Sequence, residues 1–209
     1  MSARLITRPT GLLSLLFPRP PRSLAPSRAL RAWLLAALAA VALMFLAPSV
    51  SDGQTTGKLE LKTTAFRTSG NIPRQFTCEG ANASPALTWS DPPAGTKSFA
   101  LIVDDPDAPM GTFVHWVVYN LPPATHQLPE GVPAGGDLRG GGMQGMNDFP
   151  KTGYGGPCPP PGKPHRYFFR LYALDSLLTL KAGARRAEVD RAMKGHVLAQ
   201  AELMGTFGR

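Results

Sequence analysis

Carboxylates and imidazoles occur at three places in the chain, each beside a turn or a predicted strand. The run DDPDAP, residues 104–109, places three aspartates on a turn that two prolines stiffen. His115 lies inside the apolar run FVHWVV, and His165 leaves a loop rich in proline and glycine. A single aspartate at such a turn ordinarily caps backbone amides, and a single strand histidine ordinarily belongs to the core. Three aspartates together with two histidines indicate a functional site instead.

This set of groups is compatible with three kinds of chemistry. In anion binding, imidazoles and glycine amides donate to a phosphate or carboxylate, and an aspartate holds a histidine ring in place. A metal site could use two histidines and two aspartates, but no closely spaced ligand pair such as H-x-x-x-H occurs. Hydrolysis by a serine nucleophile would need a G-x-S-x-G elbow, which the sequence lacks.

Hydrophobic patterns predict the strands that must position these groups. Four segments have the pattern of β-strands: residues 59–66, 99–103, 113–121 and 167–174. The second is continuously apolar, as in a strand that is buried on both faces. In the third, regular alternation places His115 on the same face as Val117 and on the opposite face from Trp116.

Only the C-terminus has helical periodicity. Apolar residues recur at a spacing of about 3.6 from Ala184 to Met204, which predicts one helix, or two short helices that break near Gly195. The glycine-rich stretch 122–164, between two predicted strands, is typical of a functional loop. Strands first and helix last, without βαβ alternation, predict a mainly β sandwich with a peripheral C-terminal helix or helices.

The first 57 residues differ from the rest of the chain in charge and composition. Residues 32–47 are uncharged and mostly apolar, and basic residues precede them. Such a pattern is typical of a signal peptide or an uncleaved membrane anchor, followed here by a small polar linker. We therefore expect a single domain, residues 58–209, that is periplasmic or secreted, or anchored to the inner membrane.

The net charge of +8 does not indicate a nucleic-acid-binding protein. Residues 1–50 contain six arginines and no acidic residue, so the remaining chain holds 16 of the 22 basic residues against all 14 acidic ones. No basic stripe with interleaved aromatic residues occurs there. We expect a small-molecule ligand and leave a protein partner and a homodimer open. Membrane contact is expected only through the N-terminal anchor, if it is uncleaved.

The two cysteines, Cys78 and Cys158, fall in the domain that is expected to be exported. Oxidising compartments maintain disulfides, which favours a bridge between them. Such a bridge would close a loop of about 80 residues and stabilise the domain by on the order of 4 kcal/mol in the chain-entropy model. Two separate buried thiols are the alternative.

Three ordered motifs resemble those of the phosphatidylethanolamine-binding protein family. They are DDPDAP, FVHWVVYNLP and GYGGPCPPPGKPHRYFFRLYALD, and with FTCEGANASPALTWSDPP and MKGHVLAQAELMGTFGR the resemblance covers residues 59–209. The chain is most similar to the bacterial Raf-kinase-inhibitor-like branch, of the YbhB/YbcL type. This resemblance implies a sandwich of two antiparallel sheets, with a small cavity near one end that binds phosphate-type groups, including phospholipid head groups.

The resemblance also implies a set of ligand-binding residues. These are Asp105, Asp107, His115, Gly155, Gly156, Pro157, His165 and Tyr167. Within this set, we expect the two histidines to donate to the anion, the amides of residues 155–156 to complete the cradle, and Tyr167 to line it. Asp105 is expected to orient a histidine, because an ionised carboxylate would repel the ligand.

The chain departs from the animal members of the family at one wall of this cavity. Where those proteins read glycine-proline-proline, this chain reads Gly156-Pro157-Cys158, so a bridge from Cys158 to Cys78 would pin the wall. The N-terminal inhibitor surface of the animal members is not recognisable, so kinase inhibition is not carried over. The preferred function is an exported binding protein for a phosphate ester or phospholipid head group, with no cofactor and no catalytic residue. The alternative is an inhibitor or regulator of a protease or other protein partner in the cell envelope, and a hydrolytic enzyme ranks last.

Overall fold

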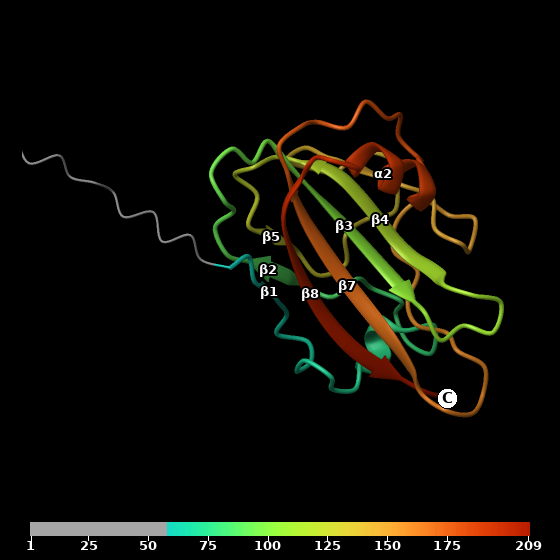
Figure 1. The fold of residues 1–209 in the computed structure, drawn as a ribbon. Helices are drawn as coiled ribbons and strands as arrows, with labels where there is room; N and C mark the ends of the chain where they lie inside the picture. Colours follow the sequence, from blue (N-terminus) through green and yellow to red (C-terminus); the bar gives the residue numbers. More distant parts are fainter. Residues whose placement is uncertain (1–57) are drawn as a thin grey trace, which may run out of the picture. The chain divides into compact units, whose positions relative to one another are not determined.

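The computed structural model describes residues 58–209 of the 209-residue chain. The signal peptide or anchor predicted within residues 1–57 lies outside the described residues. The described part folds as two antiparallel sheets with one α-helix, which confirms the predicted mainly β fold (Figure 1). No helix in residues 58–209 has both the length and the apolar character that crossing a membrane requires.

The larger sheet has five strands in the order β6-β4-β3-β7-β8, and the smaller sheet has the order β1-β2-β5. In chain order the elements are β1 (Leu61–Lys62), the 3-10 helix η1 (Arg74–Phe76), β2 (Leu87–Trp89), β3 (Ser98–Asp105), β4 (Phe113–Leu121), β5 (Gln127–Leu128), β6 (Met143–Gln144), β7 (His165–Leu174), α2 (Arg186–Met193) and β8 (Val197–Phe207). The three long predicted strands therefore correspond to β3, β4 and β7.

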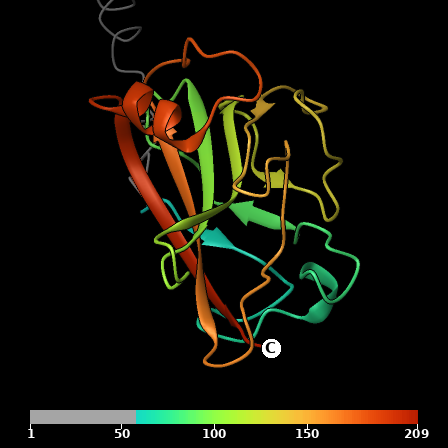
Figure 2. The ribbon, with the colours of Figure 1, turned by 90° about the vertical axis from the view of Figure 1, so that its right-hand side faces the viewer.

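Strand β3 is buried along its whole length, because both faces of the larger sheet are covered. On one face Phe99, Leu101 and Val103 join a core with apolar residues of β1, β2 and β5. On the other face Ala100 and Ile102 join a second cluster with the apolar side of α2. Figure 2 shows the larger sheet with α2 and the short strands around it. The two faces of β3 therefore lie in different environments, and so do the successive side chains at its C-terminal end, Asp104 and Asp105.

The C-terminal segment corrects the sequence-based prediction of a helix to Met204. Helix α2 ends at Met193, and residues 197–207 form β8. Gly195, two residues after the end of α2, adopts a φ of 84°, a conformation that glycine takes without steric cost and that breaks the helical path. Strand β8 pairs antiparallel with β7, and its residues Leu203 and Phe207 are buried in the core on one face of the sheet. The apolar residues of this segment fit a period of two as well as 3.6, and pairing with β7 selects the strand.

Candidate functional site

One cavity lies at the end of the larger sheet where β3 ends and β7 begins. Its volume is about 150 Å³, and its polar side chains are Asp105, His115 and His165. The rings of Phe113 and Phe149 form part of its lining. One of the two predicted carboxylates, Asp105, and both predicted histidines therefore meet in one place, although they lie far apart in the sequence.

A β-bulge in β4 turns His115 toward this cavity. Residues 103–104 of β3 pair with Trp116 and Val114, so His115 is an extra residue opposite them. Val114 and Val117 both pack in the cluster with α2, whereas Trp116 packs in the core on the other face. The predicted alternation, which placed His115 on the face of Val117, is wrong because the bulge adds one residue between Val114 and Trp116.

The ring of His115 is held by one hydrogen bond and by aromatic packing. Its Nδ1 lies 2.6 Å from the carbonyl oxygen of Gly155. Because a carbonyl can only accept, Nδ1 carries the proton and Nε2 of the neutral ring carries the lone pair. Tyr167 and Phe149 pack edge to face on the ring, at centroid distances of 5.2 and 5.5 Å. Burial lowers the pKa of His115, so the ring of the free site is neutral near pH 7.

His165 is oriented by a buried carboxylate. Its Nδ1 lies 2.7 Å from Oδ2 of Asp105, whose side chain is nearly inaccessible to solvent. The other oxygen of Asp105 accepts the backbone N–H of Asp107 at 2.8 Å. Both oxygens of Asp105 are therefore occupied by groups of the protein, and the histidine that this carboxylate orients is His165.

The three aspartates of the DDPDAP turn reach three different environments. Asp104 points to the α2 face, where its two oxygens accept hydrogen bonds from arginines of β7 and α2. Asp107 accepts hydrogen bonds from Nε and from a terminal nitrogen of Arg166, at 2.9 and 2.7 Å. This guanidinium holds the pKa of Asp107 well below its usual range. Only Asp105 lines the cavity, so the predicted placement of Asp107 among the ligand-binding residues is not supported.

The loop of residues 153–158 forms one wall of the cavity, and its backbone N–H groups have partners that the sequence did not predict. The N–H of Gly155 donates to the carbonyl of His115 at 2.9 Å. The N–H of Gly156 donates to Oδ1 of Asn82 at 2.7 Å. In this structure both amides already have acceptors within the protein, so neither is free to donate to an anion, as was expected of them. The wall therefore positions His115 through its two hydrogen bonds with Gly155. An anion in the cavity would be bound by side chains and not by these amides.

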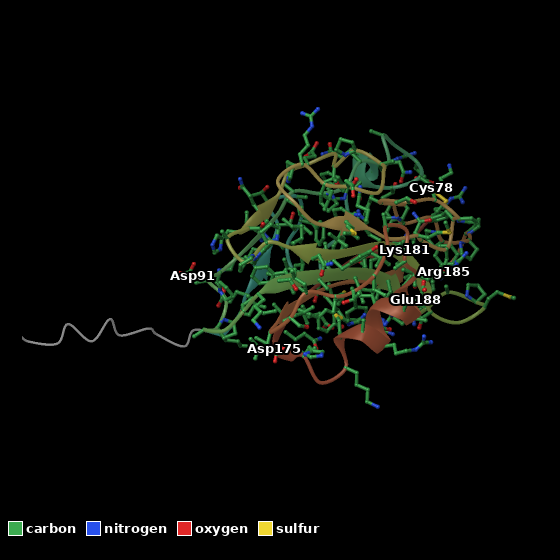
Figure 3. All side chains as sticks on the ribbon, turned by 90° about the horizontal axis from the view of Figure 1, so that it is seen from above. Cys78, Asp91, Asp175, Lys181, Arg185 and Glu188 are labelled. Atoms are coloured by element: carbon green, nitrogen blue, oxygen red, sulfur yellow. A yellow bond between two sulfur atoms is a disulfide. The ribbon has the colours of Figure 1, made fainter. Side chains whose placement is uncertain are left out.

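The predicted disulfide joins Cys78 and Cys158, with their Cα atoms 5.4 Å apart. Cys158 and the two prolines after it line the cavity, so the bridge attaches this wall to the segment that follows η1. The backbone N–H of Cys78 also donates to the carbonyl of Pro157 at 3.1 Å. Figure 3 shows Cys78 toward one end of the domain and Asp91 at the opposite end. The bridge therefore stabilises the end of the domain that carries the cavity.

Tyr167 packs on the ring of His115 but does not line the cavity. Its side chain is fully buried, and its hydroxyl has no hydrogen-bond partner among the described residues. Burial raises the pKa of this phenol well above its ordinary value. Tyr167 was expected to line the cavity, but in this structure it packs on the ring of His115 and is not part of the lining.

Replacing Tyr167 with phenylalanine is expected to preserve the free energy of unfolding or to raise it by up to about 1 kcal/mol. The reason is that the substitution removes a buried hydroxyl that makes no hydrogen bond and keeps the ring on which His115 packs. Urea unfolding of both proteins measures the difference. A loss of more than about 1 kcal/mol would contradict the prediction and would mean that the hydroxyl is hydrogen-bonded in solution.

Several residues of the site were missed from the sequence, and Phe149 is the clearest example. It follows Asn147 and Asp148 in a glycine-rich loop, where no hydrophobic period identifies an aromatic ring that packs against a strand. It packs on both Phe113 and His115 of β4. In residues 58–209 no group of three or more histidine, cysteine, aspartate or glutamate side chains is placed to hold a metal ion.

Sequence comparisons extend over almost the whole described domain. Residues 62–208 match the model of the family described as phosphatidylethanolamine-binding protein. The UPF0098 protein of Methanothermobacter thermautotrophicus is 52% identical over 151 residues, which cover 72% of this chain and 99% of that protein. The UPF0098 protein of Aquifex aeolicus is 48% identical over 153 residues, 72% of this chain and 89% of that protein.

Two solved structures are similar in fold and in sequence. A putative phosphatidylethanolamine-binding protein homologue from Chlamydia trachomatis is 40% identical, with a TM-score of 0.67, over 73% of this chain and 98% of that one. YbcL of Escherichia coli, described as a member of the mammalian family, is 35% identical, with a TM-score of 0.67, over 73% of this chain and 99% of that one.

Proposed function

Because the chain belongs to the phosphatidylethanolamine-binding protein family, we propose that it binds a small anion, a phosphate ester or phospholipid head group, between His115 and His165. One observation carries this proposal: both imidazoles line a single cavity, and Nδ1 of each already bonds to an acceptor of the protein. Nε2 of each ring is therefore the nitrogen left for a ligand.

The size of the cavity limits what it can enclose. Its volume of about 150 Å³ is smaller than the sites that enclose drug-sized ligands, which begin at roughly 300 Å³. A phosphate group with a few further atoms suits such a volume, and the acyl chains of a lipid would remain outside it. The bound part of the ligand is therefore its head.

Anion binding at His115 is coupled to proton uptake under this proposal. Burial keeps the pKa of the free His115 below its usual value of about 6.5. A negative charge at Nε2 favours the imidazolium form and therefore raises the pKa in the complex. Between these two pKa values the complex holds one more proton than the free protein, so binding strengthens as the pH falls.

The affinity for sulfate is accordingly expected to increase from pH 8 to pH 5.5, by up to about tenfold per pH unit. Sulfate is a suitable probe because its own charge does not change in this range. Calorimetry in two buffers of different ionisation enthalpy measures both the affinity and the number of protons taken up. An affinity that is independent of pH, with no proton uptake, would contradict the assignment of His115.

Calorimetry with glycerol 3-phosphate tests the proposed function directly, with glycerol as the control that lacks the phosphate. We expect a Kd below about 1 mM for the ester and no binding of glycerol. Absence of binding of both the ester and inorganic phosphate would overturn the proposal.

We also propose that the domain acts outside the cytoplasm, as a periplasmic or secreted protein. Two observations support this location. The Cys78–Cys158 bridge joins two exposed cysteines, and such disulfides persist in oxidising compartments. The apolar segment 32–47 follows six arginines, as in an export signal. Fractionation of cells that express the full chain would test the proposal, and recovery in the cytoplasm with reduced cysteines would oppose it.

A further inference from the structure

A second cavity lies next to the first and shares the side chain of Phe149 with it. Its volume is about 160 Å³. Lys151, Asn82 and the backbone of residues 155–156 belong to its lining, which contains no aspartate or glutamate. Its charge is therefore set by the ammonium group of Lys151.

The side chain of Phe149, which packs directly on Gly155, forms the boundary between the two cavities. A Cβ atom added to Gly155 would lie 2.5 Å from Cδ2 of Phe149, so the ring covers this position directly. The carbonyl of Gly155 accepts the hydrogen bond from Nδ1 of His115, which lines the first cavity. Gly155 itself lines the second cavity. The ring of Phe149 is only partly buried. Phe149 is therefore the residue that a ligand with its phosphate at His115 would have to pass to reach the second cavity.

The buried side chain of Asn147 holds Phe149 and Lys151 in fixed positions. It is 1% exposed, and its Oδ1 accepts the backbone N–H groups of Phe149 at 2.9 Å and Lys151 at 3.1 Å. Its Nδ2 donates to the carbonyl of Gly153 at 2.9 Å. Because one oxygen binds both amides, the backbone turns tightly between residues 149 and 151. This turn places the ring at the boundary and the lysine at the second cavity.

The polar side chains that line the second cavity can donate hydrogen bonds to a ligand, and their acceptor oxygens are already used within the protein. Lys151 forms no ion pair with any residue of 58–209. Asn82 uses Oδ1 to accept the amide of Gly156, and its Nδ2 makes no hydrogen bond within the described residues. The hydroxyl of Tyr154 donates to the carbonyl of Phe76 at 2.8 Å. An ammonium group and a carboxamide N–H therefore remain, and both favour an anionic or carbonyl oxygen.

We propose that the second cavity is a subsite for a second anionic group of the same ligand. The ligand class is then a phosphate ester that also carries a carboxylate or a second phosphate. An ester that carries an ammonium group, such as phosphoethanolamine, would meet the like charge of Lys151. This inference rests on the proposed function, because the first cavity must hold the phosphate.

Calorimetry with two closely related esters tests the subsite. 3-Phosphoglycerate differs from glycerol 3-phosphate in having a carboxylate in place of a hydroxymethyl group. We expect the wild-type protein to bind 3-phosphoglycerate roughly three- to tenfold more tightly, as one partly exposed charged hydrogen bond implies. In Lys151→Met the ratio of the two affinities, that for 3-phosphoglycerate over that for glycerol 3-phosphate, is expected to fall to about one. The affinity for glycerol 3-phosphate itself should stay within about twofold of the wild-type value.

Lys163→Met is the matched control, because it removes the same charge from an exposed lysine that lines neither cavity. It is expected to keep the wild-type ratio. Lys151→Met should fold normally, since the structure uses the backbone N–H of Lys151 and not its side chain.

The possible results separate this inference from the function on which it rests. If both esters bind and Lys151→Met leaves their ratio unchanged, the subsite is wrong and the anion-binding function stands. A preference of the wild-type protein for O-phosphoethanolamine over 3-phosphoglycerate would also overturn the subsite. If none of the phosphate compounds binds, both proposals fail together.

Discussion

Replacement of His115 by alanine is expected to lower the affinity for glycerol 3-phosphate by roughly 10- to 100-fold. The substitution removes one of the two imidazoles of the cavity, and with it the group that takes up a proton when the anion binds. His165, held by Asp105, would remain as the only histidine in the cavity. Calorimetric titration of the wild-type protein and the variant at pH 6 measures the effect.

A second variant guards against a trivial loss of folding. Alanine at position 115 leaves the carbonyl of Gly155 without its donor and opens space between Phe149 and Tyr167. His115→Gln keeps a polar side chain of similar length, but the glutamine amide cannot be protonated. We therefore expect this variant to bind sulfate weakly, with an affinity that no longer increases as the pH falls.

His196→Ala is the matched control for this experiment. His196 is exposed, and its Nδ1 lies 2.7 Å from Asp175, beyond the far end of β7 from the cavity. This variant should bind like the wild-type protein. Wild-type affinity in a folded His115→Ala protein would remove His115 from the binding site.

Replacement of both Cys78 and Cys158 by serine is expected to lower the free energy of unfolding by roughly 2–5 kcal/mol. The bridge spans a sequence separation of 80 residues, so it removes much conformational freedom from the unfolded chain. Unfolding in guanidinium chloride should give a lower midpoint for the variant. Wild-type protein with a reductant present should behave like the variant.

The same variant reports on the cavity wall. Without the bridge, the wall at residues 156–158 remains attached through the hydrogen bonds from Gly156 to Asn82 and from Cys78 to Pro157. We expect weaker binding of glycerol 3-phosphate, because these two hydrogen bonds alone would hold Cys158 and the prolines after it less firmly beside the histidines. A loss of less than about 1 kcal/mol with unchanged affinity would show that the hydrogen bonds alone maintain the wall.

The strands that carry the site could be predicted from the sequence. Residues 99–103, 113–121 and 167–174 are apolar, β-branched or aromatic, and they fall within β3, β4 and β7. Such segments are determined largely by local composition, because strands buried in a sheet must be apolar. The polar residues of the cavity could also be recognised from the sequence, since Asp105 and His115 lie in or next to apolar strands.

The sequence by itself thus determined the family, the mainly β fold and most of the chemical groups at the cavity. The tertiary structure decided where several of those groups point. The bulge in β4 turns His115 to the cavity side, and pairing with β7 makes residues 197–207 a strand. The physical reason is that a bulge and a strand pairing depend on the neighbouring strand, which local hydrophobic periodicity does not describe.

The same reason applies to the hydrogen-bond partners of the site. Asp105 and Asp107 belong to one turn, yet one binds His165 in the cavity and the other binds Arg166 at the surface. The amide of Gly156, expected to hold an anion, instead donates to Asn82. Each of these partners comes from a distant part of the chain, and only the folded sheets bring them within hydrogen-bonding distance.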